Sequence, residues 1–220
     1  MTRKFSVKNM ALIAILSAVA YLLVCLIRIP IIPAAPFLQY EPKDVVIAIC
    51  GFLLGPAAAL ISGILVAFVE FFTISTTGVI GLVMNVLSTC SYACTAAIIY
   101  KKKHSLSGAV LGLVFATIAM AAVMLLWNYL ITPLYMAGTS RSDIAKMLVP
   151  VFLPFNLLKA GLNSALILFL YKPLVTGLRK ANLLPGSSAQ SSRSLLGICL
   201  LGLGLTLVLV LVLLILNGTI

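Results

Sequence analysis

Three polar residues interrupt a long apolar stretch in the second half of the chain. Asn156, Lys159 and Asn163 lie within residues 148–171, and their spacings of three, four and seven place them on one helix face. A charged side chain deep in a bilayer costs about 2.5–3.5 kcal/mol, so such a residue commonly faces a cavity or a partner. Lys159 could instead extend its ammonium toward the membrane surface, but it lies about a dozen residues into the apolar stretch. We therefore expect Lys159 to face a ligand. As an isolated buried charge, it should be replaceable by methionine without harm to membrane insertion.

Further polar candidates lie in the two preceding apolar stretches. Trp127, Asn128 and Tyr129 come late in residues 106–135. The Asn128 amide offers two donors and one acceptor, which suits a ligand site. Its aromatic neighbours are equally typical of the belt at a membrane–water boundary. Asn85 is compatible with a ligand contact or with a hydrogen bond between two helices.

A stiff, proline-framed segment joins the first two apolar stretches. Residues 37–44 combine an aromatic ring, an amide and charges between Pro36 and the next helix. Such a segment suits a lid over a ligand, and an ordinary solvated loop is the alternative.

The elements that must position these residues are membrane-spanning helices. Hydrophobic residues make up 63% of the 220 residues and charged residues 9%, whereas a soluble domain carries about a quarter charged residues. A soluble domain of this size could not bury so much apolar surface. We therefore predict an all-α, polytopic membrane protein. The expected spans are residues 9–28, 45–72 (broken at Gly55-Pro56 into two shorter helices), 79–100, 106–135 and 148–171, with a polar loop at 138–146.

The C-terminal part departs from this pattern. Residues 181–194 are rich in glycine and serine, and predict a flexible cytoplasmic linker between a membrane domain at 1–180 and the next apolar stretch. Residues 195–216 are almost entirely leucine, valine, isoleucine and glycine, and predict a seventh transmembrane helix that serves as an anchor or lipid-facing accessory.

The distribution of basic residues predicts the orientation. The formal net charge is +11, and the basic residues sit at the ends of apolar stretches, which the positive-inside rule explains better than nucleic-acid binding. With the N-terminus in the cytoplasm, ten basic residues lie inside and four outside. The ten are Arg3, Lys4, Lys8, Lys101, Lys102, Lys103, Lys172, Arg179, Lys180 and Arg193.

Several chemistries have no matching sequence motif. The chain has no phosphate-binding G-x-x-x-x-G-K-[ST] loop and no zinc-binding H-E-x-x-H motif. Its five cysteines are not accompanied by histidine, so no metal site is predicted and small apolar packing roles are expected. We expect a protein that is not an enzyme, with no cofactor and no metal.

At these residues the chain resembles a known family, the S components of energy-coupling-factor (ECF) vitamin transporters, and specifically the riboflavin-binding members. The resemblance covers roughly residues 8–180. Its most specific parts are residues 153–159, and Asn128-Tyr129 followed by Pro133-Leu134-Tyr135; residues 51–56 and the Ala14-x-x-x-Ala18 pattern support it.

The resemblance implies a six-helix bundle in a bacterial cell membrane that binds riboflavin near the outer face, under the first loop. It implies a separate transmembrane scaffold subunit and two cytoplasmic ATPase subunits as partners. The small-xxx-small face of Ala14 and Ala18, which permits close helix approach, would dock on the scaffold. An S component for another vitamin, such as pantothenate, and a stand-alone secondary carrier remain alternatives. Expected flavin contacts are Asn128, Asn156 and Lys159, with Gln39, Tyr40, Thr77 and Asn85 as further candidates.

Overall fold

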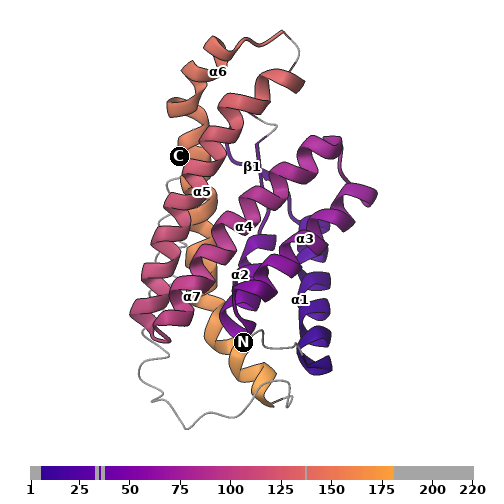
Figure 1. The fold of residues 1–220 in the computed structure, drawn as a ribbon, viewed down its shortest axis with the longest axis vertical. Coiled ribbons are helices and arrows are strands. Elements are labelled where there is room, and N and C mark those ends of the chain that lie inside the picture. Colours follow the sequence, from indigo (N-terminus) through magenta and orange to yellow (C-terminus); the bar gives the residue numbers. More distant parts are fainter. Residues whose placement is uncertain (1–5, 33–34, 36–37, 137, 181–220) are drawn as a thin grey trace.

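The fold is a bundle of long helices with a small two-stranded hairpin at one end (Figure 1). This computed structural model describes residues 6–32, 35, 38–136 and 138–180. The predicted linker 181–194 and seventh helix 195–216 lie outside the described residues. The elements are α1 (Val7–Leu26), β1 (Ile29–Pro30), β2 (Gln39–Tyr40), α2 (Lys43–Leu54), α3 (Pro56–Thr73), α4 (Gly78–Lys102), α5 (Leu106–Tyr135), α6 (Arg141–Met147), the π-helical turn η1 (Leu148–Phe152) and α7 (Leu153–Lys180).

The short helix α2 is the centre of the bundle. Every residue from Lys43 to Phe52 is buried, and the helix contacts α1, α3, α4 and α7. Twelve residues extend only about 18 Å, too short to cross a bilayer. The predicted break at Gly55 is confirmed: Gly55 has φ +98°, which favours glycine, and Pro56 starts α3 where no intrahelical N–H is needed.

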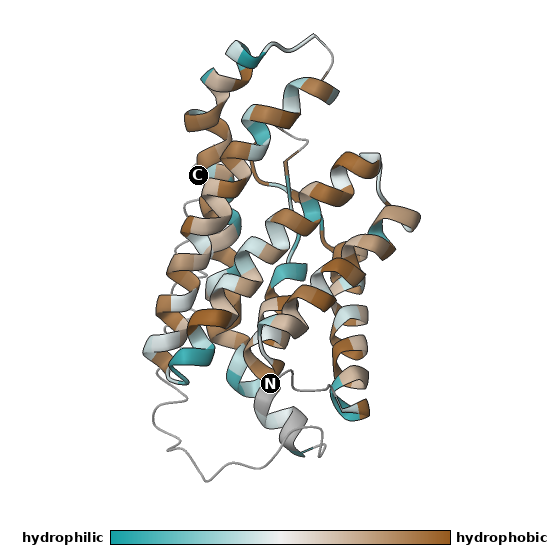
Figure 2. Ribbon diagram, in the orientation of Figure 1, coloured by the Kyte–Doolittle hydropathy of each residue, from teal (hydrophilic) through white to brown (hydrophobic). Residues whose placement is uncertain are grey.

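The outer helices present apolar side chains to their surroundings. Figure 2 shows hydrophobic residues along the outer helices. In the described part of the chain, five segments are long and apolar enough to span a membrane: α1, α3, α4, α5, and the continuous segment from α6 into α7. Together with the central α2, they form the predicted all-α polytopic bundle.

One connection differs from the sequence prediction, and a second, the extended first loop, includes a short hairpin. Residues 138–146 were expected to form a polar loop, but α6 begins at Arg141 behind a capping box in which Ser140 and Asp143 bond each other's backbone N–H. The helix then continues through η1 into α7. The first loop is not wholly irregular either, because β1 pairs antiparallel with β2, with Ile29 opposite Tyr40.

The face of α1 that carries Ala14 and Ala18 is exposed. Both alanines point away from the bundle, whereas Leu12, Leu16 and Ala20 of the same helix are buried in the core. The position is compatible with docking, which stays a prediction because a lipid-facing helix would show the same exposure.

Candidate functional site

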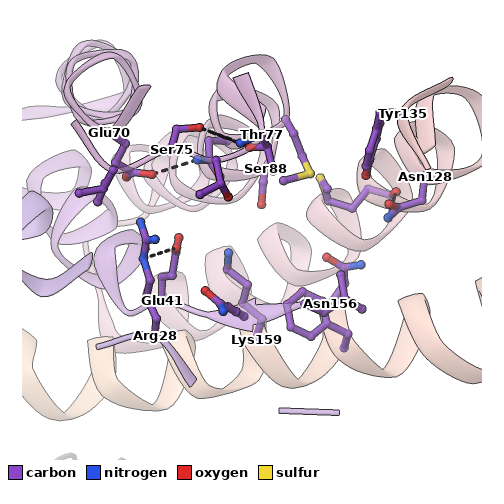
Figure 3. Close-up of a pocket in the computed structure, with 18 of the residues that line it drawn as sticks. Arg28, Glu41, Glu70, Ser75, Thr77, Ser88, Asn128, Tyr135, Asn156 and Lys159 are labelled. Carbon is purple, nitrogen blue, oxygen red and sulfur yellow. Dashed lines mark hydrogen bonds and ion pairs between the residues drawn. The ribbon is translucent and has the colours of Figure 1, made fainter. Parts of the chain in front are cut away.

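A cavity of about 440 Å³ opens at the hairpin end of the bundle. Its wall is formed by the hairpin and by parts of α3, α4, α5 and α7. The volume falls in the range of small-molecule sites, roughly 300–1,000 Å³. Figure 3 shows Lys159 and Asn156 on one side of the space and Ser75, Thr77 and Ser88 on the other.

Helix α7 supplies the two central polar groups. Pro150 and Pro154 lack N–H donors, and the chain passes through η1, a π-helical turn of a kind often found at functional sites, just before this region. The Asn156 Nδ2 donates to the Phe152 carbonyl at 2.7 Å, which fixes the amide and leaves its carbonyl oxygen for another partner. One turn further along, the Lys159 side chain also lines the cavity and is 9% exposed.

Helix α5 contributes Asn128 and part of an apolar wall. The Asn128 Nδ2 donates to the Met124 carbonyl at 2.7 Å, and its Oδ1 accepts from the Thr132 hydroxyl at 3.0 Å. These two bonds orient the amide at the cavity surface. The apolar and aromatic lining around it comprises Leu38, Ile74, Met84, Met124, Tyr135, Met136 and Phe155.

Of the four further candidates, three line the same cavity and one does not. Gln39, Thr77 and Asn85 are part of the wall. Asn85 is already engaged, because its Nδ2 donates to Glu70 Oε2 at 2.9 Å. Tyr40 lies behind the wall, where its hydroxyl donates to Asn163 Oδ1 at 3.1 Å. Burial and the nearby Asp44 carboxylate raise the pKa of the Tyr40 phenol, which therefore stays protonated.

Two ion-pair clusters lie beside the cavity, and the first is built around Lys43. The Lys43 Nζ lies 2.7 and 2.8 Å from the two oxygens of Glu70 and 3.1 Å from Glu41 Oε2. Arg28 Nε lies 3.3 Å from the other Glu41 oxygen. Burial tends to raise the pKa of Glu41, but the charges of Lys43, Lys159 and Arg28 outweigh it and keep the pKa below its ordinary value.

The second cluster is built around Asp44, which is 0% exposed in the first turn of α2. Its Oδ1 accepts from the Thr89 hydroxyl at 2.7 Å, and its Oδ2 accepts from Asn163 Nδ2 at 3.4 Å. Lys159 Nζ lies 3.8 Å from the same Oδ2. The third member of the predicted helix face, Asn163, therefore contacts Asp44 and Tyr40 instead of lining the cavity.

Comparison with known proteins identifies the family. The family described as "ECF transporter, substrate-specific component" matches residues 8–171. The chain belongs to this family. A solved S component of a bacterial ECF transporter shares the fold with a TM-score of 0.67 at 29% identity, covering 78% of this chain and 98% of that chain.

Curated relatives of this S component carry more specific names. Riboflavin transporter RibU of Staphylococcus aureus (strain TCH60) is 33% identical over 181 residues, covering 79% of this chain and 93% of the relative. Riboflavin transporter RibU of Streptococcus thermophilus is 31% identical, covering 76% and 82%. Riboflavin transporter FmnP of Bacillus subtilis is 28% identical, covering 80% and 98%.

The site of this S component includes charged residues that sequence reasoning missed. Arg28, Glu41 and Glu70 line the cavity. The charges of residues 37–44 were considered only as part of a lid, and no sequence pattern linked Glu41 to Arg28 or Glu70 in one buried site. The available signal was Glu70, a carboxylate inside a strongly apolar helix, because such a residue needs a nearby cation. In the structure that cation is Lys43, whose Nζ lies 2.7 Å from Glu70 Oε2.

Proposed function

We propose that this S component captures riboflavin in the cavity at the hairpin end of the bundle. The observation that carries the proposal is the convergence of Asn128, Asn156 and Lys159 on one cavity of suitable size that also has apolar and aromatic wall residues. The names of the curated relatives support the choice of vitamin.

The chemistry of the cavity matches that of a flavin. The flavin ring system is flat and largely apolar, but one edge carries amide-like donors and acceptors. Methionine and aromatic side chains provide surface for the ring. The two asparagine amides and the Lys159 ammonium offer the complementary hydrogen bonds. The hydroxyl-bearing ribityl chain requires further polar groups, which Gln39 and Thr77 can supply on the same wall.

We infer from the distribution of basic residues that this cavity opens on the outer side of the membrane. Lys101 and Lys102 lie in the last turn of α4, and Figure 1 shows this end of the bundle away from β1, whose hairpin forms part of the cavity wall. If the basic end faces the cytoplasm, as the positive-inside rule requires, the N-terminus is cytoplasmic and the cavity receives ligand from outside.

Coupling to ATP is assigned to other subunits. We propose a transmembrane scaffold subunit and two cytoplasmic ATPase subunits as partners, with the exposed face around Ala14 and Ala18 as the docking surface on the scaffold. The small side chains would allow two helices to approach closely.

The test is a ligand-binding titration with the full chain purified in detergent. Riboflavin is expected to bind with 1:1 stoichiometry and to lose fluorescence as it enters the site, and the preparation is expected to be yellow if ligand co-purifies. A panel that includes pantothenate separates riboflavin from another vitamin. Uptake in a host without other flavin transporters, measured with and without the scaffold and ATPases, separates an S component that needs its partners from a stand-alone carrier.

A further inference from the structure

Two buried lysines lie at the same end of the bundle but differ in what surrounds their ammonium groups. Lys43 Nζ has three carboxylate oxygens within 3.1 Å and does not line the cavity. Lys159 Nζ has one carboxylate oxygen at 3.8 Å, and it makes no hydrogen bond within the described part of the chain. Lys159 therefore has a counter-charge, while its N–H donors remain available to a ligand.

Asp44 supplies that counter-charge from a fixed position. The Thr89 hydroxyl from α4 and the Asn163 amide from α7 bind its two oxygens, at 2.7 and 3.4 Å respectively. The carboxylate is fully buried and is not part of the cavity wall. Asp44 therefore makes no direct contact with a ligand in the cavity, and Lys159, which does line the cavity, is the cavity residue with which its charge is paired.

We propose that Asp44 is a positioning residue of the site, which holds the Lys159 ammonium at the cavity wall and thereby sets ligand affinity without touching the ligand. This inference rests on the proposed function. Asp44 balances the lysine charge at 3.8 Å without occupying its donors in a hydrogen bond.

The surrounding carboxylates explain why a neutral residue at position 44 would not serve. Glu41 and Glu70 line the same cavity as Lys159. Without the Asp44 charge, these two carboxylates are the remaining anionic partners for the Lys159 ammonium. An ion pair with either of them would draw the donors away from the ligand and place a protein–protein contact where the ligand should bind.

The experiment is a double-mutant cycle with riboflavin as the probe and the full chain in detergent. The proteins are the parent, Asp44→Asn, Lys159→Met and the double variant. Each single variant is expected to bind about 10- to 150-fold more weakly, in line with the loss of a hydrogen bond to a charged group. The double variant is expected to bind within about threefold of Lys159→Met, because Asp44 acts through a side chain that is no longer present.

Two results would overturn the inference. One is an Asp44→Asn protein that binds riboflavin as the parent does. The other is a double variant whose loss equals the product of the two single losses, because Asp44 would then act independently of Lys159. A merely structural role for Asp44 would also lower affinity in the Lys159→Met background.

Folding and the proposed function are controlled separately. Asp44→Asn leaves a buried ammonium without its counter-charge and is expected to be destabilised, whereas the double variant removes both charges. If Asp44→Asn does not fold, the comparison of the double variant with Lys159→Met still refutes the inference when their affinities differ by more than about threefold, because Asp44 would then act without Lys159. Lys146→Met is the matched control, since Lys146 also lies 3.8 Å from a carboxylate but is 77% exposed. If the parent itself binds no riboflavin, the proposed function fails before the cycle is measured.

Discussion

Lys43 and Lys159 are both buried lysines at one end of the bundle, but replacing each with methionine is expected to affect a different property of the protein. The Lys43 ammonium donates to both oxygens of Glu70, whereas Lys159 lines the cavity. Lys43→Met should therefore reduce stability more than the site's intrinsic affinity, and Lys159→Met should reduce affinity more than stability.

The size of the stability loss expected for Lys43→Met follows from the burial of the lysine and its partners. The side chains of Lys43 and Glu70 are 2% and 3% exposed, and Glu41 is 13% exposed. Removing one partner of a buried ion pair costs about 3–5 kcal/mol, because a carboxylate is left buried without a counter-charge. At about 2–4 °C per kcal/mol for a chain of this size, the midpoint of thermal unfolding should fall by roughly 6–20 °C.

The magnitude for Lys159 follows from the hydrogen bond it is expected to make to the ligand. Its loss should cost about 1.5–3 kcal/mol of binding free energy, which raises Kd about 10- to 150-fold. The sequence alone predicts that this variant inserts at least as well as the parent, because the lysine looks isolated. Asp44 at 3.8 Å changes that expectation to a modest loss of stability, smaller than for Lys43, because Thr89 and Asn163 still bind the Asp44 carboxylate.

The assay measures both quantities on the same preparations. Thermal unfolding without ligand gives the stability, and a riboflavin titration well below the unfolding midpoint gives the affinity, with Lys146→Met as the exposed-lysine control. The reasoning is refuted if Lys159→Met keeps parental affinity, or if Lys43→Met unfolds at the parental temperature.

Three further predictions address orientation, docking and packing. In a cysteine-free background and in intact cells, a single cysteine at Ser107 should be protected from an impermeant thiol reagent, and one at Ser142 should react with it. The reverse pattern would overturn the cytoplasmic N-terminus. Replacing Ala14 and Ala18 together with leucine should abolish uptake by the assembled transporter but preserve riboflavin binding by the isolated subunit, and a parallel loss of both would mean that this face packs inside the bundle. Gly112→Val should destabilise the bundle by about 1–3 kcal/mol in thermal unfolding, because even a Cβ at this position would lie 2.9 Å from a backbone oxygen of α4; an unchanged midpoint would show that α4 and α5 separate easily.

The sequence by itself determined the class of fold. Long apolar stretches require helices in a lipid solvent, because every backbone polar group must be bonded internally there. Gly55-Pro56 located the turn between α2 and α3, since glycine permits the positive φ and proline starts the next helix. The cost of a buried charge singled out Lys159, and helical spacing added Asn156, which lines the same cavity.

The tertiary structure decided which polar residues meet. Periodicity places Asn156, Lys159 and Asn163 on one helix face, but it does not say what lies opposite each of them. In the folded bundle, the first two line the cavity, while Asn163 contacts Asp44 and Tyr40. Gln39 lines the cavity and its neighbour Tyr40 does not, because successive residues of a strand point to opposite sides.

The sequence also could not predict which residues would pair with the buried charges. Lys43 and Glu70 are 27 positions apart, and Asp44 and Lys159 lie on helices far apart in the chain. Ion pairs of this kind depend on how helices are arranged around α2, which local patterns do not encode. A buried lysine needs a carboxylate partner, because an unpaired charge in the bundle would be strongly destabilising. The packing of the helices determines which carboxylate lies next to each lysine.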